Sequence, residues 1–363
     1  MDFSRAFNDP SACINLIKKL EQLLDSQQLR FMEVCGTHTV SIFHSGLHDL
    51  LPKNIIHLSG PGCPVCVTHD AEVATFLKFA HMNNIIIATF GDVLRIPSPD
   101  GASLKHAMAQ GARIEIIYSP LDALTIAKKN PHDIVILLGI GFETTAPTIA
   151  ATIIMAEQQQ IQNLLLFSCH KLVPPALKAL LDDNNTQIDA FLLPGHVSTI
   201  LGLAPYSFLS DYKTPGIIAG FDASDILFAL VLMTEEIIQG QFTIKNAYQR
   251  AVNNQGNPKA RAMIDQVFVV SDALWRGMGT IKNSGLTLAP KFAHRDALIA
   301  LNMTLADVKP IAGCRCGDVL KGIISPTECV LFGKKCTPAK PIGPCMVSTE
   351  GSCAAYYKYG LGN

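Results

Sequence analysis

Charged side chains are scarce in this chain of 363 residues, and neither sign is in excess. They make up 16% of the sequence, the formal net charge is −1, and no long basic or acidic run occurs. Binding to nucleic acid or to an anionic membrane surface depends on clustered positive charge, so we expect neither partner. Hydrophobic residues reach 48% of the chain, which is typical of a folded, well-packed protein.

We also expect neither an export signal nor a membrane-spanning segment. Its first ten residues, MDFSRAFNDP, contain three charges and no apolar core of a signal peptide. The longest uncharged stretch, residues 190–210, is interrupted by Pro194, Gly195, Gly202 and Pro205, which would break a membrane-spanning helix. We therefore expect a soluble, cytoplasmic protein.

Apolar runs rich in Val, Ile and Leu alternate with helical patterns through the first two-thirds of the chain. Residues 84–91 (NIIIATFG) and 133–141 (DIVILLGIG) are typical strands, and residues 69–82 and 222–240 are typical helices. Continuous apolar strands separated by helices indicate parallel sheets covered on both faces. The sequence therefore predicts an α/β protein of the doubly wound type.

Two successive series of such units predict two related α/β domains. We place the first in residues 28–118 and the second in residues 119–244. The apolar strand pattern largely stops near residue 245, and the chain after residue 313 is rich in Cys, Gly and Pro. Residues 1–27 and 245–363 are therefore assigned to a third domain, with helices at both ends of the chain and a cysteine-rich part.

Six of the 11 cysteines fall in the last 50 residues, where histidine is absent. They are Cys314, Cys316, Cys329, Cys336, Cys345 and Cys353. In a reducing cytosol such a density indicates metal or redox chemistry more than structural disulfides. An all-thiolate set suits zinc or an iron–sulfur cluster, but the paired C-x2–4-C knuckles of structural zinc are missing. We favour a cubane cluster over zinc and over thiols without metal. A cubane takes four thiolates, so two cysteines would remain as a dithiol.

A further thiol, Cys35, follows the strand-like run LRFM within EVCGTHT. It would emerge at the carboxyl end of a parallel strand, where open α/β sheets bind ligands. With His38 three residues later, Cys35 could be an activated nucleophile or an iron ligand. The simpler alternative is a half-buried thiol at a strand end.

The stretch GPGCPVC places Cys63 and Cys66 between a predicted strand and a helix expected to begin near Asp70. The partial positive charge of a helix N-terminus stabilises a thiolate, so the pair is a candidate dithiol or two-thiolate metal site. It could also be a structural turn. If Cys35 ends a neighbouring strand, all three thiols should converge at one edge of the sheet.

Several other polar residues follow predicted strands. Glu143, Thr144 and Thr145 lie in GIGFETTAP, which has the first two glycines of a dinucleotide-binding loop but not the third, so the nucleotide hypothesis is weak. Glu143 could instead face the thiols of the first domain. His196, Lys171, Asp92 and Arg95 occupy similar positions and are equally consistent with roles in fixing loops.

Together these motifs resemble the HypD family of [NiFe]-hydrogenase maturation proteins. The matching segments are MEVCGTHT, GPGCPVCVT, TFGDVLRIP, GFETTAPT, PGHVS, DALWRGMG, GCRCGDVL and CVLFGKKCTPAKPIGPCMVSTEGSCAAYYKYG, spread over residues 29–359. The resemblance implies two α/β domains and a third domain that carries a [4Fe–4S] cluster.

The resemblance also implies a function. With a HypC-type chaperone, the protein would hold Fe(II) while cyanide and carbon monoxide are attached, the cyanide coming from a HypE-type partner. Cys35 would be the iron ligand, with Cys63 and Cys66 as the thiol pair beside it. The family further suggests that Cys314, Cys329, Cys336 and Cys353 bind the cluster, leaving Cys316 and Cys345 as a redox pair.

Two alternatives remain. A stand-alone iron–sulfur disulfide reductase would use the cluster to reduce the C-x2-C pair and would tolerate the loss of Cys35. A nucleotide-dependent enzyme would bind its ligand at GIGFETT.

Overall fold

The computed structural model describes residues 9–360. The prediction that the chain has no export signal rests mainly on the first eight residues, which lie outside this range. No helix within residues 9–360 combines the length and apolar composition needed to cross a lipid bilayer.

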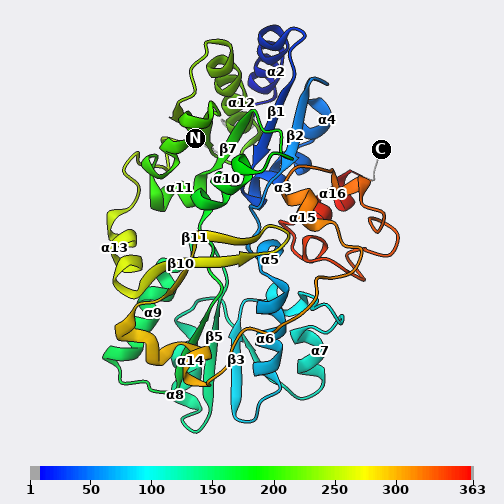
Figure 1. The fold of residues 1–363 in the computed structure, drawn as a ribbon. Helices are drawn as coiled ribbons and strands as arrows, with labels where there is room; N and C mark the ends of the chain where they lie inside the picture. Colours follow the sequence, from blue (N-terminus) through cyan, green and yellow to red (C-terminus); the bar gives the residue numbers. More distant parts are fainter. Residues whose placement is uncertain (1–8, 361–363) are drawn as a thin grey trace.

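The chain forms two separate parallel sheets (Figure 1). The first has the order β2-β1-β7-β8-β9 and the second the order β4-β3-β5-β6. The strands of the first sheet are β1 (Leu29–Glu33), β2 (Ile55–Ser59), β7 (Ala190–Pro194), β8 (Gly216–Ala219) and β9 (Ile244–Asn246). Those of the second are β3 (Ile85–Thr89), β4 (Arg113–Ile116), β5 (Ile134–Gly139) and β6 (Leu164–Ser168).

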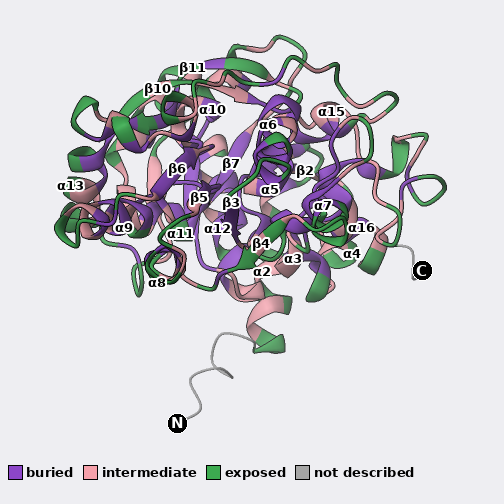
Figure 2. Ribbon diagram, turned by 90° about the horizontal axis from the view of Figure 1, so that it is seen from below, coloured by how far each residue is buried: buried purple, intermediate pink, exposed green. Residues whose placement is uncertain are grey.

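Helices cover both sheets, so the predicted α/β class with parallel sheets is confirmed. Every residue of the central strands β3 and β7 is buried, as expected for strands with helices on both faces. Figure 2 shows the same pattern, with buried strands in the interior and exposed residues on the outer helices.

The longer helices are α2 (Pro10–Leu24), α3 (Gly36–His44), α6 (Asp70–Ala80), α8 (Asp122–Lys129), α9 (Ala146–Gln158), α10 (Val173–Asp182), α12 (Ala223–Ile238), α13 (Pro258–Val267) and α16 (Ser352–Tyr359). The remaining α-helices are α4 (Leu47–Leu50), α5 (Pro64–Val67), α7 (Leu104–Ala109), α11 (Gly195–Leu201), α14 (Ala297–Ala300) and α15 (Cys316–Leu320), and the 3-10 helices are η1 (Val93–Arg95), η2 (Ala204–Tyr212), η3 (Pro290–Arg295), η4 (Pro326–Glu328) and η5 (Pro344–Met346).

The two sheets are not built from consecutive parts of the chain. The chain leaves the first sheet after β2, builds the whole second sheet, and returns at β7. The predicted ranges 28–118 and 119–244 therefore do not each carry one sheet, because β3 and β4 pair with β5 and β6 while β7 pairs with β1. Hydrophobic periodicity identifies a strand but contains no information about the strand with which it pairs.

An antiparallel hairpin that the sequence pattern did not predict lies between the two sheets. It consists of β10 (Phe268–Trp275) and β11 (Gly279–Leu288). Thr68 after β2 bridges to Trp275, and Lys171 after β6 bridges to Gly285, so the hairpin touches both sheets. The sequence analysis placed no strand in this part of the chain, because the apolar strand pattern largely stops near residue 245. Buried and exposed residues do not alternate regularly along β10, so the strand signal is weak.

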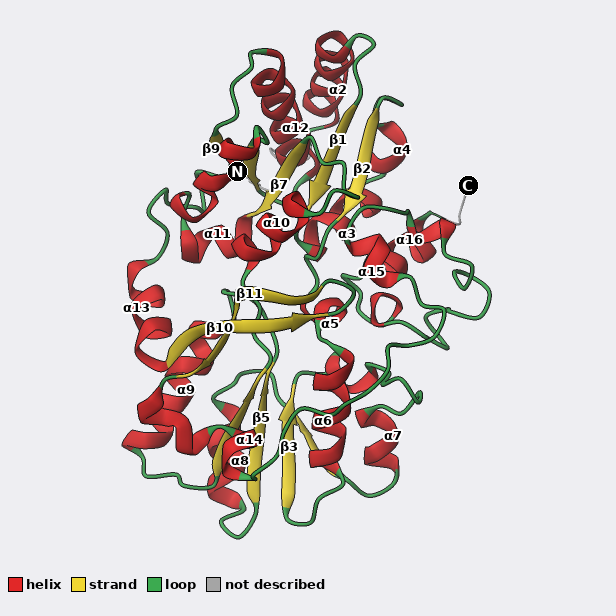
Figure 3. Ribbon diagram, viewed as in Figure 1, coloured by secondary structure: helices red, strands yellow, loops and turns green. Residues whose placement is uncertain are grey.

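The carboxyl ends of the strands in both sheets point toward this hairpin (Figure 3). The cysteine-rich segment packs beside the same region, with α16 against α3 and η5 against α5. The edges at which α/β sheets bind ligands therefore face each other across the centre of the molecule.

Candidate metal centre

Cys35 stands at the point where the strand order of the first sheet reverses. The chain passes from β1 to β2 on one side of β1, and β7 is added later on the other side. Doubly wound sheets bind ligands in the crevice at such a point. Cys35 is the second residue after β1, occupies the N-cap position of α3 and is only 8% exposed.

The GPGCPVC loop packs directly on the main chain around Cys35. The Gly60 N–H donates to the Glu33 carbonyl oxygen at 2.8 Å, and the Gly36 N–H donates to the Gly62 carbonyl oxygen at 3.1 Å. A Cβ atom on Gly62 would collide with the main-chain nitrogen of Cys35, so only glycine allows this approach. The loop thus delivers Cys63, the next residue, beside Cys35.

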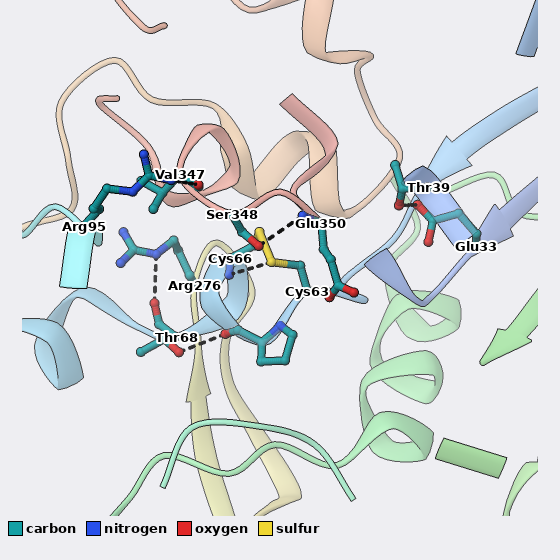
Figure 4. The surroundings of a disulfide bond; sticks show 11 residues. Glu33, Thr39, Cys63, Cys66, Thr68, Arg95, Arg276, Val347, Ser348 and Glu350 are labelled. Carbon is teal, nitrogen blue, oxygen red and sulfur yellow. Dashed lines mark hydrogen bonds between the residues drawn. A yellow bond between two sulfur atoms is a disulfide. The ribbon is translucent and has the colours of Figure 1, made fainter. Parts of the chain in front are cut away.

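Cys63 and Cys66 form a disulfide in this structure (Figure 4). Cys63 caps the short helix α5, and Pro64 occupies its first turn. The Cys66 N–H also points at the sulfur of Cys63, at 3.3 Å. The loop therefore holds the two cysteines together as a disulfide that closes a four-residue turn.

The thiol of Cys35 lies in an environment that favours its protonated form. Burial raises the pKa of Cys35 to about 12, and the nearby carboxylates of Glu350 and Glu33 act in the same direction. Glu33 accepts hydrogen bonds from the Cys35 N–H at 3.0 Å and from Thr39 Oγ1 at 2.6 Å. A metal cation displaces the proton of a coordinating thiol, so this site suits a metal ligand better than a free thiolate nucleophile.

His38, which the sequence suggested as a base for Cys35, forms its hydrogen bond with the loop after β8 instead. Its Nε2 lies 2.9 Å from the Gly220 carbonyl oxygen, and burial lowers the pKa of His38 to about 4. Its ring packs on Phe221, and the exposed His196 stacks on the same ring with centroids 4.1 Å apart. His38 is therefore a neutral, buried residue that fixes α3 to the loop after β8.

A residue that sequence reasoning missed, Glu350, closes the site from the cysteine-rich side. Its Oε1 accepts a hydrogen bond from Thr37 Oγ1 at 2.8 Å, and its main chain packs on Gly36. More than 300 residues separate the partners, and Glu350 does not follow a strand, so no local signal in the sequence indicated this contact.

The six carboxyl-terminal cysteines line a single pocket. Cys314, Cys316, Cys329, Cys336, Cys345 and Cys353 all contribute, together with apolar side chains that include Leu331, Phe332 and Met346. Hydrogen bonds link the thiol of Cys316 to those of Cys314 and Cys345, and these bonds lower the pKa of Cys316. Six cysteines from a 40-residue span thus surround one largely apolar pocket.

This donor set fits an iron–sulfur cluster. In residues 9–360, no three His, Cys, Asp or Glu side chains converge closely enough to hold a single metal ion. Each thiolate of a cubane binds a different iron atom, so its four ligands surround a pocket instead of meeting at one point. The assignment of Cys314, Cys329, Cys336 and Cys353 as ligands, with Cys316 and Cys345 as a redox pair, stays a prediction.

The pocket adjoins the Cys63–Cys66 loop through the tip of the hairpin. The Arg276 N–H donates to the Val67 carbonyl oxygen at 3.0 Å, its Nε donates to the Thr68 carbonyl oxygen at 2.9 Å, and its guanidinium pairs with Asp70. The same guanidinium helps to lower the pKa of Cys316. Arg276 therefore contacts the loop that follows Cys66 and acts on Cys316, and sequence reasoning had not singled it out.

The remaining candidates belong to the second sheet. Glu143 lies at the corresponding reversal point, between β3 and β5, where it accepts a hydrogen bond from the Val173 N–H at 2.9 Å. Thr145 Oγ1 donates to the Phe142 carbonyl oxygen at 3.1 Å within the same loop. Lys171 forms a buried ion pair with Glu72 at 2.6 Å. Glu143 thus contacts the first turn of α10 and Lys171 contacts α6, and none of these hydrogen bonds or ion pairs involves Cys35.

The last two candidates, Arg95 and Asp92, lie outside the site: Arg95 binds the cysteine-rich segment, whereas Asp92 is exposed. Arg95 Nη2 donates to the Val347 carbonyl oxygen at 2.8 Å and so ties the cysteine-rich segment to the second sheet. Asp92 is exposed. Arg95 therefore fixes a loop, as one of the two sequence interpretations proposed.

A family model described as "HypD: Hydrogenase formation hypA family" matches residues 11–360. The chain belongs to the HypD family. It is 40% identical to hydrogenase maturation factor HypD of Escherichia coli, with 99% of this chain and 98% of that protein covered. It is 39% identical to HypD2 of Bradyrhizobium diazoefficiens over 99% and 97% of the two chains, and 40% identical to HypD of Cupriavidus necator over 92% and 90%. The resemblance drawn from the motifs is confirmed.

Proposed function

We propose that this HypD-family protein is a hydrogenase maturation factor that holds Fe(II) while its cyanide and carbon monoxide ligands are attached. The observation that carries this proposal is the position of Cys35: a buried thiol at a ligand-binding sheet edge, with a disulfide loop packed on its main chain. Fe(II) with strong-field ligands suits soft thiolate coordination. A HypC-type chaperone would supply a second ligand to the iron cargo.

The neighbouring thiol pair accounts for the electrons that the reaction consumes. Release of cyanide from a thiocyanate on a HypE-type partner breaks the S–C bond, and two electrons are needed to leave both a thiolate and cyanide. Oxidation of the Cys63–Cys66 dithiol to the disulfide provides two electrons and two protons. Cys35 would then bind the iron that receives the cyanide, so iron binding and electron supply lie side by side.

The pair formed by Cys316 and Cys345 would restore the dithiol. A thiolate of this pair attacks the Cys63–Cys66 disulfide, and the second thiol resolves the mixed disulfide. One disulfide forms and one is reduced, so electrons balance. Packing of η5, which contains Cys345, against α5 supports this exchange. A [4Fe–4S] cluster held by Cys314, Cys329, Cys336 and Cys353 would supply single electrons to the protein.

The second candidate is the stand-alone disulfide reductase, which the Cys63–Cys66 disulfide also favours. This reductase would carry out the same thiol exchange but would not bind iron at Cys35. Protein purified without oxygen alongside a HypC-type partner distinguishes the two through iron and acid-labile sulfide content and a Mössbauer spectrum. About four irons and four sulfides, plus a low-spin iron lost in Cys35→Ala, are expected for the maturation factor. A cluster without separate iron would support the reductase instead.

A further inference from the structure

The turn of the hairpin, residues 276–278, packs on other parts of the chain, although turns usually lie free at the surface. Trp275, the last residue of β10, is completely buried, and Arg276 is only 5% exposed. Two sets of contacts hold this turn, one with the segment that follows the Cys63–Cys66 disulfide and one with α15. The turn therefore has a fixed position relative to both segments.

The first set of contacts joins the turn to the residues that directly follow the Cys63–Cys66 disulfide. The Arg276 N–H donates to the Val67 carbonyl oxygen at 3.0 Å, and its Nε donates to the Thr68 carbonyl oxygen at 2.9 Å (Figure 4). Thr68 also forms a β-bridge with Trp275. The main chain and the side chain of one turn residue thus fix the end of α5, the helix that carries the second sulfur of the disulfide.

The second set of contacts joins the turn to α15, which begins at Cys316. A Cβ atom added to Gly277 would collide with the Cα atom of Gly317, and a Cβ atom added to Gly317 would collide with the Cα atom of Gly277. The two main chains are therefore in direct contact, which only glycine permits at both positions. Because no flexible side chain lies between them, a change in the turn moves α15 directly.

We infer that the hairpin turn is a positioning element for thiol–disulfide exchange, which holds Cys316 at a fixed separation from the Cys63–Cys66 disulfide. This inference rests on the proposed function, in which the carboxyl-terminal dithiol reduces that disulfide. In the exchange, the Cys63–Cys66 bond breaks and two electrons and two protons pass to its sulfurs, while a bond forms between Cys316 and Cys345. The sulfurs must come close together in a defined geometry, so a displacement of α15 by about 1 Å should slow the exchange strongly.

Disulfide cross-linking measures this separation in the full-length protein, purified without oxygen. The parent protein carries Cys35→Ala, Cys63→Ser and Cys345→Ser, so that one thiol of each pair remains. Diamide oxidises these two thiols, Cys66 and Cys316, to a disulfide and takes up the two electrons and two protons. Alkylation followed by mass spectrometry of the digested protein gives the rate of cross-linking, and iron and sulfide content with Tm report on the fold.

Gly277→Ala should slow the cross-link by about tenfold or more, because the added Cβ displaces α15 from the turn. Gly279→Ala is the matched control. The φ angles of Gly277 and Gly279 are 74° and 73°, so the two variants carry similar backbone strain, but nothing lies within 4 Å of a Cβ on Gly279. This control should cross-link at the rate of the parent. Equal rates in the two variants would overturn the inference, and so would a parent that does not form the cross-link.

Arg276→Lys tests the contact with the disulfide loop and serves as the second variant if Gly277→Ala fails to fold. Lysine keeps the positive charge beside Asp70, but it cannot reproduce the fork that binds Asp70 and the Thr68 carbonyl oxygen together. The cross-link should therefore form about threefold or more slowly than in the parent. A rate equal to that of the parent would overturn the positioning role of Arg276.

The outcome is separable from that of the proposed function, because cross-linking is measured without iron at Cys35. A negative result would refute the positioning element alone. Failure of the proposed function would instead appear as the absence of a separate iron in the wild-type protein.

Discussion

The three thiols at the first sheet and the six thiols near the carboxyl terminus are held by different means. Cys35, Cys63 and Cys66 follow two paired strands, and main-chain hydrogen bonds between their loops set their positions. The six others lie in a segment, residues 313–353, whose regular elements are all five residues or shorter apart from the start of α16. The first centre is thus built by the fold, whereas the second lines a pocket that its own short elements hold weakly.

This difference shows what each centre requires for its structure. A parallel sheet with a buried core positions its strand ends whether or not a ligand is bound. A loop-rich segment that buries little surface depends on cross-links or on a bound metal group. Loss of a thiol should therefore abolish function at the first centre and local structure at the second.

Cys35→Ala should have the largest effect on function and a small effect on the fold. We expect loss of hydrogenase maturation in cells by at least about 100-fold, with Tm within about 2 °C of the wild type, because the hydrogen bonds of the sulfur with Thr37, at the start of α3, are weak. Hydrogenase activity in a complemented deletion strain measures the first, and thermal unfolding measures the second. Maturation retained in this variant would eliminate the iron-ligand role of Cys35.

Cys329→Ala should show the opposite pattern. We expect loss of the cluster and faster hydrogen exchange throughout residues 313–353, with unchanged protection of β3 and β7, since metal binding and folding are coupled in such segments. Iron and sulfide analysis with hydrogen exchange tests this. Cys13→Ala, at a half-buried thiol on α2, is the control and should change neither quantity. A full complement of iron and sulfide in Cys329→Ala would show that the ligand assignment is wrong.

Gly62→Ala tests whether the fold itself sets the first centre. The added Cβ would collide with the main chain of Val34 and Cys35, so we expect destabilisation of about 2–3 kcal/mol and weaker iron binding. Gly91→Ala is a matched control, because its Cβ would meet only Ile116 Cγ2, at an ordinary 3.7 Å. Urea unfolding of both variants measures the difference, and equal stability would contradict the close packing described here.

Acid should weaken the sheets more than the cysteine-rich segment, which contains no histidine. Burial lowers the pKa of His170, after β6, to about 3, and the charge of Lys171 acts in the same direction. Between pH 6.5 and 3 the unfolded chain therefore binds a proton at this residue that the folded chain does not, and stability falls as the pH falls.

His170→Asn should accordingly lose about 2 kcal/mol less stability between pH 7 and pH 5 than the wild type does. Urea unfolding at the two pH values measures this difference. An equal loss in both proteins would mean that His170 becomes protonated in the folded state.

Much of the fold and of the candidate site could be predicted from local sequence patterns. The strands β3 and β5 lie within the predicted strands 84–91 and 133–141, and α6 begins at Asp70 as expected. The positions of Cys35 and of the Cys63–Cys66 pair at strand ends followed from the strand-like runs before them. These predictions succeed because a few adjacent residues determine a buried strand and the turn that follows it.

What depends on distant parts of the chain could not be predicted in this way. The interleaving of the two sheets, the hairpin between them, and the contacts of Glu350 with Thr37 and of Arg276 with Thr68 join residues that lie hundreds of positions apart or follow no regular pattern. Local periodicity reports which face of an element is buried, but not what covers that face. Long-range packing alone brings three strand-end thiols and a six-thiol pocket together at the centre of one molecule.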